Sequence, residues 1–348
     1  MRHRFALILA ASIAGLFQPA AVAAQSRDVE VRVRLESSDG TRLSGALVAL
    51  LDSAQRVVVE GVSDGNGSRL FRAPPGSYVI RVRRIGFLPF VSPGVLLPRT
   101  NDIVLRVESA HVALRTVTVT SRSKCGAIDR NERELSVLWD EIAKALRTSQ
   151  LSARDLAGVA EAFIYRTQLA KTGAVVSSDT TFHPVSGGKP FGMVDPGVLA
   201  AQGYVRGDAR AGWTYYGPDE AVLLSDHFAE THCFRIVRDR KRSGEVGIDF
   251  KPVRDRPVAD IAGVLWVDEG TAELRELVFR FVNAGVLDRF SPGGSTQFRR
   301  VPSGAWIVDS WMIRGPVLTG TDRTFGVLAA IGSVVDGGGM RMREPLPR

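Results

Sequence analysis

Histidine and cysteine are scarce in this sequence, whose 348 residues include five histidines and two cysteines. A structural zinc site uses about four such ligands and a catalytic one about three. Neither cysteine has a second cysteine at metal-ligand spacing, which disfavours a thiolate zinc site. The phosphate-binding motifs G-x-x-x-x-G-K-[ST] and G-x-G-x-x-G are also absent. We expect no cofactor.

Long apolar runs are absent after residue 24, because the nearest candidate, Val327 to Val335, is far shorter than the roughly 20 residues that span a bilayer. Residues 1–24 begin with Arg2 and Arg4, continue as the apolar run Phe5 to Phe17 and end in small residues. This is the layout of a secretory signal peptide. The alternative is a membrane anchor, for which the apolar run is too short. We therefore expect an exported protein that does not span a membrane and lies in the periplasm or against the outer membrane.

A strong excess of one charge sign is also missing, because the chain is only modestly basic. The chain has 45 Lys and Arg against 37 Asp and Glu, a formal net charge of +8. Acidic and basic residues alternate, as in Asp28 to Arg34, whereas polyanion sites cluster one sign. We expect no nucleic-acid partner. The densest cationic run, Arg235 to Arg242, is predicted in a hairpin loop, where it could touch anionic lipid or lipopolysaccharide.

The two cysteines, Cys125 and Cys233, form an even set in a chain that we expect to be exported. In an oxidising compartment they would pair by default. Two buried free thiols are the alternative. A bridge would close a loop for which the chain-entropy model gives about 4 to 5 kcal/mol of stabilisation, an upper figure if native strain intervenes.

The segment from Asp28 to Glu108 predicts a β-sandwich. Asp28 to Glu36 alternates apolar and charged residues, the pattern of a half-buried strand. Asp64 to Gly67 offers residues suited to a tight hairpin turn. Further strands are expected at Gly45–Leu51, Arg56–Val62, Leu70–Phe71, Ser77–Arg83 and Ile103–Val107. About seven short strands, with turn signals roughly every ten residues, are typical of a sandwich.

Five short motifs in this segment occur in an order that resembles the carboxypeptidase regulatory-like domain. They are Asp39-Gly40, Leu43 to Val48, Ser63 to Gly67, Pro75 to Tyr78 and Arg84 to Pro89. The resemblance implies a transthyretin-like fold for residues 25–110, of the carbohydrate-binding-like kind. Similar domains precede many TonB-dependent outer-membrane receptors. The sequence departs from the family at Phe87, where Tyr is commoner, and at Ser63, where Thr is usual.

Beyond a linker at residues 111–130, the remainder to residue 343 predicts an α+β domain with a long antiparallel sheet. A helix is expected after Asn131, because Leu138, Ile142 and Leu146 fall on one stripe. Two short helices are expected at Asp195–Gly203 and Ser225–Thr231. Strands are expected at Phe163–Thr167, Ala174–Phe182, Phe234–Val237, Val246–Phe250, Ala262–Val267, Leu274–Val282, Thr296–Val301, Trp306–Ile313 and Thr324–Val335. Such a meander suggests a curved sheet wrapped on the long helix.

The segment Gly263 to Leu277, a strand, an Asp-containing turn and a strand, resembles the periplasmic lipoprotein-carrier half-barrels. This resemblance covers Ser152 to Arg343 by pattern and by few identities. It would imply a concave sheet able to hold an apolar or glycan ligand.

Two sets of candidate site residues remain. His227 to Glu230 has the H-x-x-E form of a zinc carboxypeptidase, with His232 as a third candidate ligand. The expected downstream histidine is missing, because His232 is the last in the chain. The second set is aromatic and suits a sugar or acyl ligand, although packing is the alternative role. Its members are Trp213, Tyr215, Tyr216, Trp306 and Trp311, of which the last two are five residues apart and so predicted to face opposite sides of a strand.

Taken together, these features predict a non-catalytic, exported envelope protein with a binding or scaffolding role. The expected partner is a glycan or lipid ligand, or an outer-membrane protein. Two alternatives stay open: a zinc carboxypeptidase-like hydrolase at His227, Glu230 and His232, and an accessory module of a TonB-dependent outer-membrane system.

Overall fold

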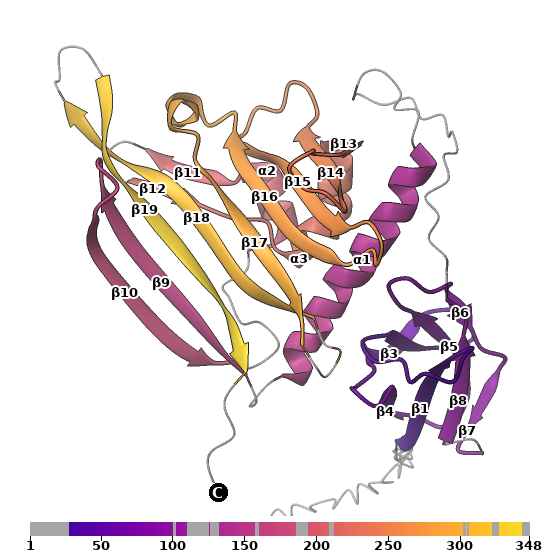
Figure 1. The fold of residues 1–348 in the computed structure, drawn as a ribbon. Helices are drawn as coiled ribbons and strands as arrows, with labels where there is room; N and C mark the ends of the chain where they lie inside the picture. The colour runs from indigo at the N-terminus through magenta and orange to yellow at the C-terminus, as the bar shows by residue number, and fades with distance from the viewer. Residues whose placement is uncertain are drawn as a thin grey trace, which may run out of the picture.

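The computed structural model describes residues 28–99, 102–109, 125, 132–156, 160–185, 194–208, 212–301, 304, 306–321 and 327–342. The chain is mainly β, as the sequence predicts, and its strands form two regions with separate hydrophobic cores (Figure 1). The expected signal peptide at 1–24 and Asn131, after which the long helix is expected, lie outside the described residues. So does the linker at 111–130, apart from Cys125.

The first region is a two-sheet assembly of short strands. One sheet has the order β4-β1-β8 and the other the order β3-β2-β5-β6, with β7 paired to β5. The strands are β1 (Val29–Ser37), β2 (Leu47–Leu51), β3 (Val57–Val62), β4 (Ser68–Ala73), β5 (Gly76–Arg83), β6 (Phe90–Val91), β7 (Val95–Leu97) and β8 (Asp102–Val107). The described residues of this region form eight strands, where the sequence predicts about seven. The two that the sequence does not locate, β6 and β7, are too short to show a pattern.

The alternation in the sequence places one face of β1 and one face of β5 inside this region. Val31, Val33 and Leu35 of β1 are buried, and they share a core with Tyr78 and Ile80 of β5. The charged residues between them point outward, since successive side chains of a strand leave on opposite faces. The pairing of β1 with β8 is parallel, which no local pattern could show.

The second region is a nine-stranded antiparallel sheet with the order β10-β9-β19-β18-β17-β16-β15-β14-β13. Figure 1 shows it as a curved sheet, with the long helix α1 (Glu132–Asp155) beside its β13 to β18 part. The strands are β9 (Ala160–Ala170), β10 (Val175–Pro184), β13 (His232–Val237), β14 (Glu245–Pro252), β15 (Asp260–Asp268), β16 (Leu274–Val282), β17 (Gly293–Arg300), β18 (Trp306–Thr321) and β19 (Val327–Met342).

Helix α1 packs on the sheet through the stripe that the sequence predicts. Leu138, Ile142, Ala145 and Leu146 are at most 2 % exposed and belong to the core of the sheet region. Burying one large aliphatic side chain contributes roughly 1.5 to 3 kcal/mol, so these contacts account for the docking of the helix. Among the described residues, no helix is long and apolar enough to cross a bilayer.

Between β10 and β13 the chain forms a small insert over one face of the sheet. It contains α2 (Pro196–Gln202), the hairpin β11 (Val205–Asp208) and β12 (Gly212–Tyr215), α3 (Glu220–Leu223) and α4 (Asp226–Thr231). Asp195 and Ser225, the first residues of the two short helices that the sequence predicts, cap α2 and α4. Asp195 accepts hydrogen bonds from the N–H groups of Gly197 and Val198, and Ser225 accepts one from Phe228. The short 3₁₀ helix η1 (Gly285–Phe290) follows β16.

The two regions meet along the outer side of α1. Leu47 and Val62 of the sandwich pack with Leu151 of the helix. Polar contacts flank this patch: Arg69 pairs with Asp155 at 2.6 Å, and the Gly86 N–H donates to a Glu141 carboxylate oxygen at 3.0 Å. Arg147 of α1 also pairs with Glu60. Helix α1 thus packs against the sheet on one side and against the sandwich on the other.

Candidate ligand-binding site

A cavity of about 200 Å³ lies between the insert and strands β16 to β18 of the curved sheet. Figure 1 shows α2, α3 and the β11–β12 hairpin at this part of the sheet. The lining is largely apolar. Its residues are Val194 and Leu199 at α2, Tyr215 to Glu220 from the end of β12 to the start of α3, Phe279, Ser295, Thr296 and Phe298 on β16 and β17, and Val308 and Trp311 to Ile313 on β18.

Three of the five candidate aromatics meet in this cavity. Tyr215 and Tyr216 come from the end of β12, and Trp311 comes from β18. Trp213 lies on β12 and packs against the core without lining the cavity. Trp306 is 3 % exposed and lines a different cavity between the two regions.

The prediction that Trp306 and Trp311 face opposite sides of the strand is wrong. A register shift in the β17–β18 pairing, between Gln297 and Phe298, places one extra residue in β18. Such a bulge resets the two-residue alternation, so two positions five apart come to the same face. Both tryptophans accordingly contact the core of the sheet region.

The ring of Tyr215 is packed between neighbouring residues, whereas its hydroxyl lacks a hydrogen-bond partner among the described residues. The ring lies 5.3 Å from that of Phe281, measured between centroids, and a Cβ atom at Gly315 would lie 2.4 Å from a ring carbon. Only glycine therefore fits beneath the ring. Within the described residues, the buried Tyr215 hydroxyl has no hydrogen-bond partner. Burial raises the pKa of Tyr215 to about 12, so the hydroxyl stays protonated and can donate.

Glu220 supplies a second polar group to the cavity. Its carboxylate accepts a hydrogen bond from the Ser149 hydroxyl of α1 at 2.7 Å. Burial raises the pKa of Glu220, and the Ser149 hydrogen bond opposes that shift without cancelling it. The cavity therefore has apolar and aromatic walls and is lined by two residues that carry hydrogen-bonding groups, Tyr215 and Glu220, which suits an apolar ligand that carries a hydroxyl or amide.

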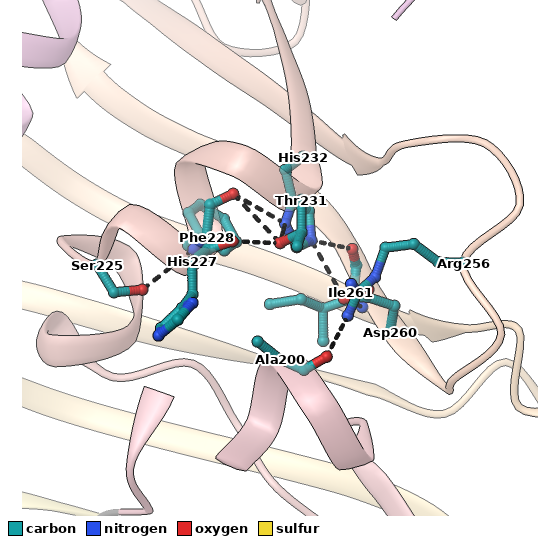
Figure 2. A network of polar contacts seen from close by, with 9 residues as sticks. All are labelled: Ala200, Ser225, His227, Phe228, Thr231, His232, Arg256, Asp260 and Ile261. Atoms are coloured by element: carbon teal, nitrogen blue, oxygen red, sulfur yellow. Dashed lines mark hydrogen bonds and ion pairs between the residues drawn. The ribbon is translucent and has the colours of Figure 1, made fainter. Parts of the chain in front are cut away.

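The three candidate zinc ligands do not converge. His227 and Glu230 are exposed on α4, whereas His232 is 3 % exposed at the start of β13. The His227 ring points away from His232 (Figure 2). Among the described residues, no group of three or more His, Cys, Asp or Glu side chains could hold a metal ion.

His232 instead belongs to a buried polar network with Asp260 and Arg256 (Figure 2). Its Nε2 atom lies 3.2 Å from an Asp260 carboxylate oxygen and 3.1 Å from the Ile261 carbonyl oxygen. Its Nδ1 atom lies 3.2 Å from the Phe228 carbonyl oxygen. Both ring nitrogens thus contact protein oxygens, so neither is directed at a ligand.

Asp260 is the centre of this network, with an exposed fraction of 0 %. It accepts hydrogen bonds from the Ile261 N–H at 2.8 Å and from Arg256, which also donates to the Ala200 carbonyl at 2.8 Å. Burial by itself would raise the pKa of Asp260, but the contacts with His232, Ile261 and Arg256 hold it below its usual value. The network ties α2 and α4 to β15.

One further motif has the form of a hydrolase nucleophile turn. Residues Gly61 to Gly65 match G-x-S-x-G, in which the serine would stand exposed between a strand and a helix. Here Ser63 is 2 % exposed and lies between two strands. Its hydroxyl donates to the Leu43 carbonyl at 2.6 Å and accepts from the Ala46 N–H at 2.9 Å. The serine therefore has a structural role.

The disulfide prediction is confirmed: Cys125 and Cys233 are bonded. The bridge fixes residue 125 to the first strand of the β13–β14 hairpin, beside His232. The cationic run that begins at Arg235 extends from β13 into the turn of this hairpin. Arg238 pairs there with Glu134 and Glu269, and Arg242 pairs with Glu245 and Glu276. Much of the run is thus neutralised within the protein.

Comparison with known proteins does not show a family for this chain. No family model and no curated protein sequence matches the chain. Among solved structures, one match is the Bacillus anthracis TIE protein, with 12 % sequence identity and a TM-score of 0.21. That match covers 45 % of this chain and 27 % of the TIE protein. The chain therefore spans about a quarter of that structure's length, and a likeness at this level carries no argument about fold or role.

Proposed function

We propose that this protein is an exported, non-catalytic envelope protein whose curved-sheet region binds a lipid- or glycan-type ligand. The single observation that carries the proposal is the cavity between the insert and β16 to β18, where Tyr215, Tyr216 and Trp311 meet. The ligand would place an apolar or ring-shaped part against these aromatics. One of its hydroxyl or amide groups would accept a hydrogen bond from the otherwise unpartnered Tyr215 hydroxyl.

The volume of the cavity bounds what can enter. An engineered apolar cavity of about 150 Å³ binds benzene, and this cavity has about 200 Å³. It therefore suits one six-membered ring or a short alkyl segment, with the rest of a larger ligand outside. In this proposal the carboxypeptidase regulatory-like sandwich is a scaffold that holds α1.

The non-catalytic part of the proposal is supported by where the candidate chemistry lies. The hydrolase alternative needs His227, Glu230 and His232 to act together, but His232 is held by Asp260 and by two backbone carbonyls. Ser63 is likewise buried and fully engaged in hydrogen bonds to the backbone.

The experiment is a calorimetric titration of the purified full chain with butyl, hexyl and octyl glucoside below their micelle concentrations, with glucose and hexanol as separate arms. We expect alkyl glucosides to bind and affinity to rise with the alkyl chain until the cavity is filled. Binding of glucose alone would identify a glycan site, and binding of hexanol alone a lipid site.

Tyr215→Phe keeps the ring and removes the hydroxyl. One hydrogen bond contributes a net of roughly 0.5 to 1.5 kcal/mol, so affinity should fall about two- to twelvefold. Tyr165→Phe is the matched control, because that ring packs over Gly337 of β19, away from the cavity. Equal affinity of the two variants, or no binding of any probe to the wild-type chain, would refute the proposal.

A second candidate, a partner module of a TonB-type outer-membrane system, is favoured by strand β10. Within the described residues it ends the sheet, and each of its ten residues is exposed. An unpaired edge can accept a strand from another protein. Thr180→Pro removes one edge N–H from this strand. If pull-downs from envelope extracts recover the same receptor with and without this change, the edge is not the docking site.

A further inference from the structure

A second cavity, of about 270 Å³, lies where the sandwich meets the curved sheet. The sandwich contributes Gly45 and the turn Arg84 to Phe87, which follows β5. The sheet region contributes the β15–β16 turn, Arg300 at the end of β17 and Trp306 at the start of β18. Neither region alone forms this cavity.

Two arginines from different regions converge at this cavity. The Nε atom of Arg84 donates to the Ser44 carbonyl oxygen at 2.9 Å, and an Nη atom of Arg300 donates to the same oxygen at 3.3 Å. Arg300 also donates to the Ser44 hydroxyl at 3.2 Å. Burial, and then the charge of Arg300, lower the pKa of Arg84 to about 10. The Arg84 guanidinium therefore stays cationic at neutral pH, and the neighbouring Arg300 charge repels it.

The carboxylates nearby balance these charges only in part. Glu273 lines the cavity and forms ion pairs with Arg300 and with Arg275, each at 3.5 Å, so one carboxylate is shared between two guanidinium groups. Both distances exceed the roughly 2.7 to 3.2 Å of an N–H···O hydrogen bond. Glu141 is engaged with the Gly86 N–H and with the buried Lys144 at 2.7 Å. Within the described residues, the two Nη atoms of Arg84 have no hydrogen-bond partner.

The close approach of the arginines is imposed by the packing of two loops. Gly45 has a φ of +72°, and a Cβ atom there would lie 2.3 Å from the Gly304 carbonyl oxygen. A Cβ atom at Gly304 would in turn lie 2.6 Å from the Cβ of Ser44. The loops therefore meet through glycines, and this contact holds the two guanidinium groups at one carbonyl oxygen.

We propose that this cavity is an oxyanion site, in which Arg84 and Arg300 together bind the phosphate or carboxylate group of a small ligand. A planar guanidinium presents paired N–H donors that match the two oxygens of such a group. The stacked Phe87 ring, 4.6 Å from the Arg84 guanidinium carbon, fixes the orientation of that fork. An anion held from both sides would clamp the sandwich to the sheet.

The cavity leaves room for more than the anionic group. A water molecule takes up about 30 Å³ of liquid, and the cavity has about 270 Å³. A phosphate or carboxylate with a short organic part would fill it. The site is separate from the aromatic cavity, and the two share no lining residue.

The test is a titration of the purified full chain with inorganic phosphate and, separately, with succinate, each against sodium chloride at equal ionic strength. We expect saturable binding of at least one oxyanion and none of chloride. Arg300→Gln should weaken that binding at least about tenfold, the usual scale for losing a charge-assisted hydrogen-bonding partner. Arg299→Gln is the matched control, because Arg299 pairs with Asp309 outside the cavity.

A second variant keeps the proposal testable if Arg300→Gln does not fold. Arg84→Lys preserves the charge and removes the fork, so phosphate binding should weaken while the unfolding midpoint without phosphate stays close to that of the wild type. The proposal is overturned if neither oxyanion binds more tightly than chloride, or if Arg300→Gln and Arg299→Gln bind equally. Titration with glycerol phosphate and with phosphatidate-containing vesicles then separates a soluble ester from a lipid headgroup.

Discussion

The buried network around Asp260 provides the sharpest test of how the sheet region is held together. Asp260→Asn is nearly isosteric and keeps the oxygen that accepts from the Ile261 N–H. The amide nitrogen would then stand at the Oδ2 position and face the Nε of Arg256, so a donor would meet a donor. Asp260 has an exposed fraction of 0 % and the Arg256 side chain one of 13 %, so water cannot replace the lost partner easily.

The expected cost follows from this burial. Removing one partner of a buried ion pair typically destabilises a protein by about 3 to 5 kcal/mol. Arg256 retains its hydrogen bond to the Ala200 carbonyl at 2.8 Å, which argues for the lower end, about 3 kcal/mol. With a urea m-value of about 2 kcal/mol/M, the unfolding midpoint should fall by roughly 1.5 M.

Tryptophan fluorescence during urea unfolding is the assay, because all five tryptophans lie at or beyond residue 139 and report on the sheet region. Asp249→Asn is the matched control. Asp249 pairs with Arg235 at 2.7 Å, and the Arg235 side chain is 60 % exposed. Such exposed pairs contribute about 0.2 to 1 kcal/mol, so its midpoint should move by less than about 0.5 M. If the two variants shift equally, the network does not stabilise the region as argued.

Three other outcomes are expected. The pKa of Asp260 is lowered on folding. The ionised carboxylate therefore stabilises the fold above the unfolded pKa of about 3.9, and this stabilisation is lost as the pH falls through the folded pKa. Urea unfolding midpoints between pH 2 and 7 should accordingly fall less steeply with acid in Asp260→Asn than in the wild type. Reducing the Cys125–Cys233 bridge, which spans a sequence separation of 108, should lower stability by up to about 4 to 5 kcal/mol, and labelling of two free thiols in the unreduced native chain would contradict the pairing. Gly45→Ala should destabilise the chain by about 1 to 3 kcal/mol, because the added Cβ would overlap the Gly304 carbonyl. Gly40→Ala is the control, because Gly40 has a similar φ but no atom within 4 Å of an added Cβ. Equal shifts of the thermal unfolding midpoint in the two variants would point to backbone strain rather than to the contact between the regions.

The sequence by itself determined the features that depend on near neighbours. Strand alternation has a period of two residues and helical stripes repeat within a turn, so β1, β5, the α1 stripe and the α2 cap could all be predicted from local pattern. The disulfide followed from the number of cysteines and the expected compartment.

The tertiary structure alone decided which of these elements meet. The parallel pairing of β1 with β8, the bulge that turns Trp306 and Trp311 to one face, and the enclosure of His232 by Asp260 all depend on contacts between distant residues. The two cavities arise in the same way. Tyr215 and Trp311, and likewise Arg84 and Arg300, are distant in the chain and become neighbours only when separate elements pack. Local periodicity carries no information about such pairings. It shows which face of a helix or strand is buried, but not which other element covers that face.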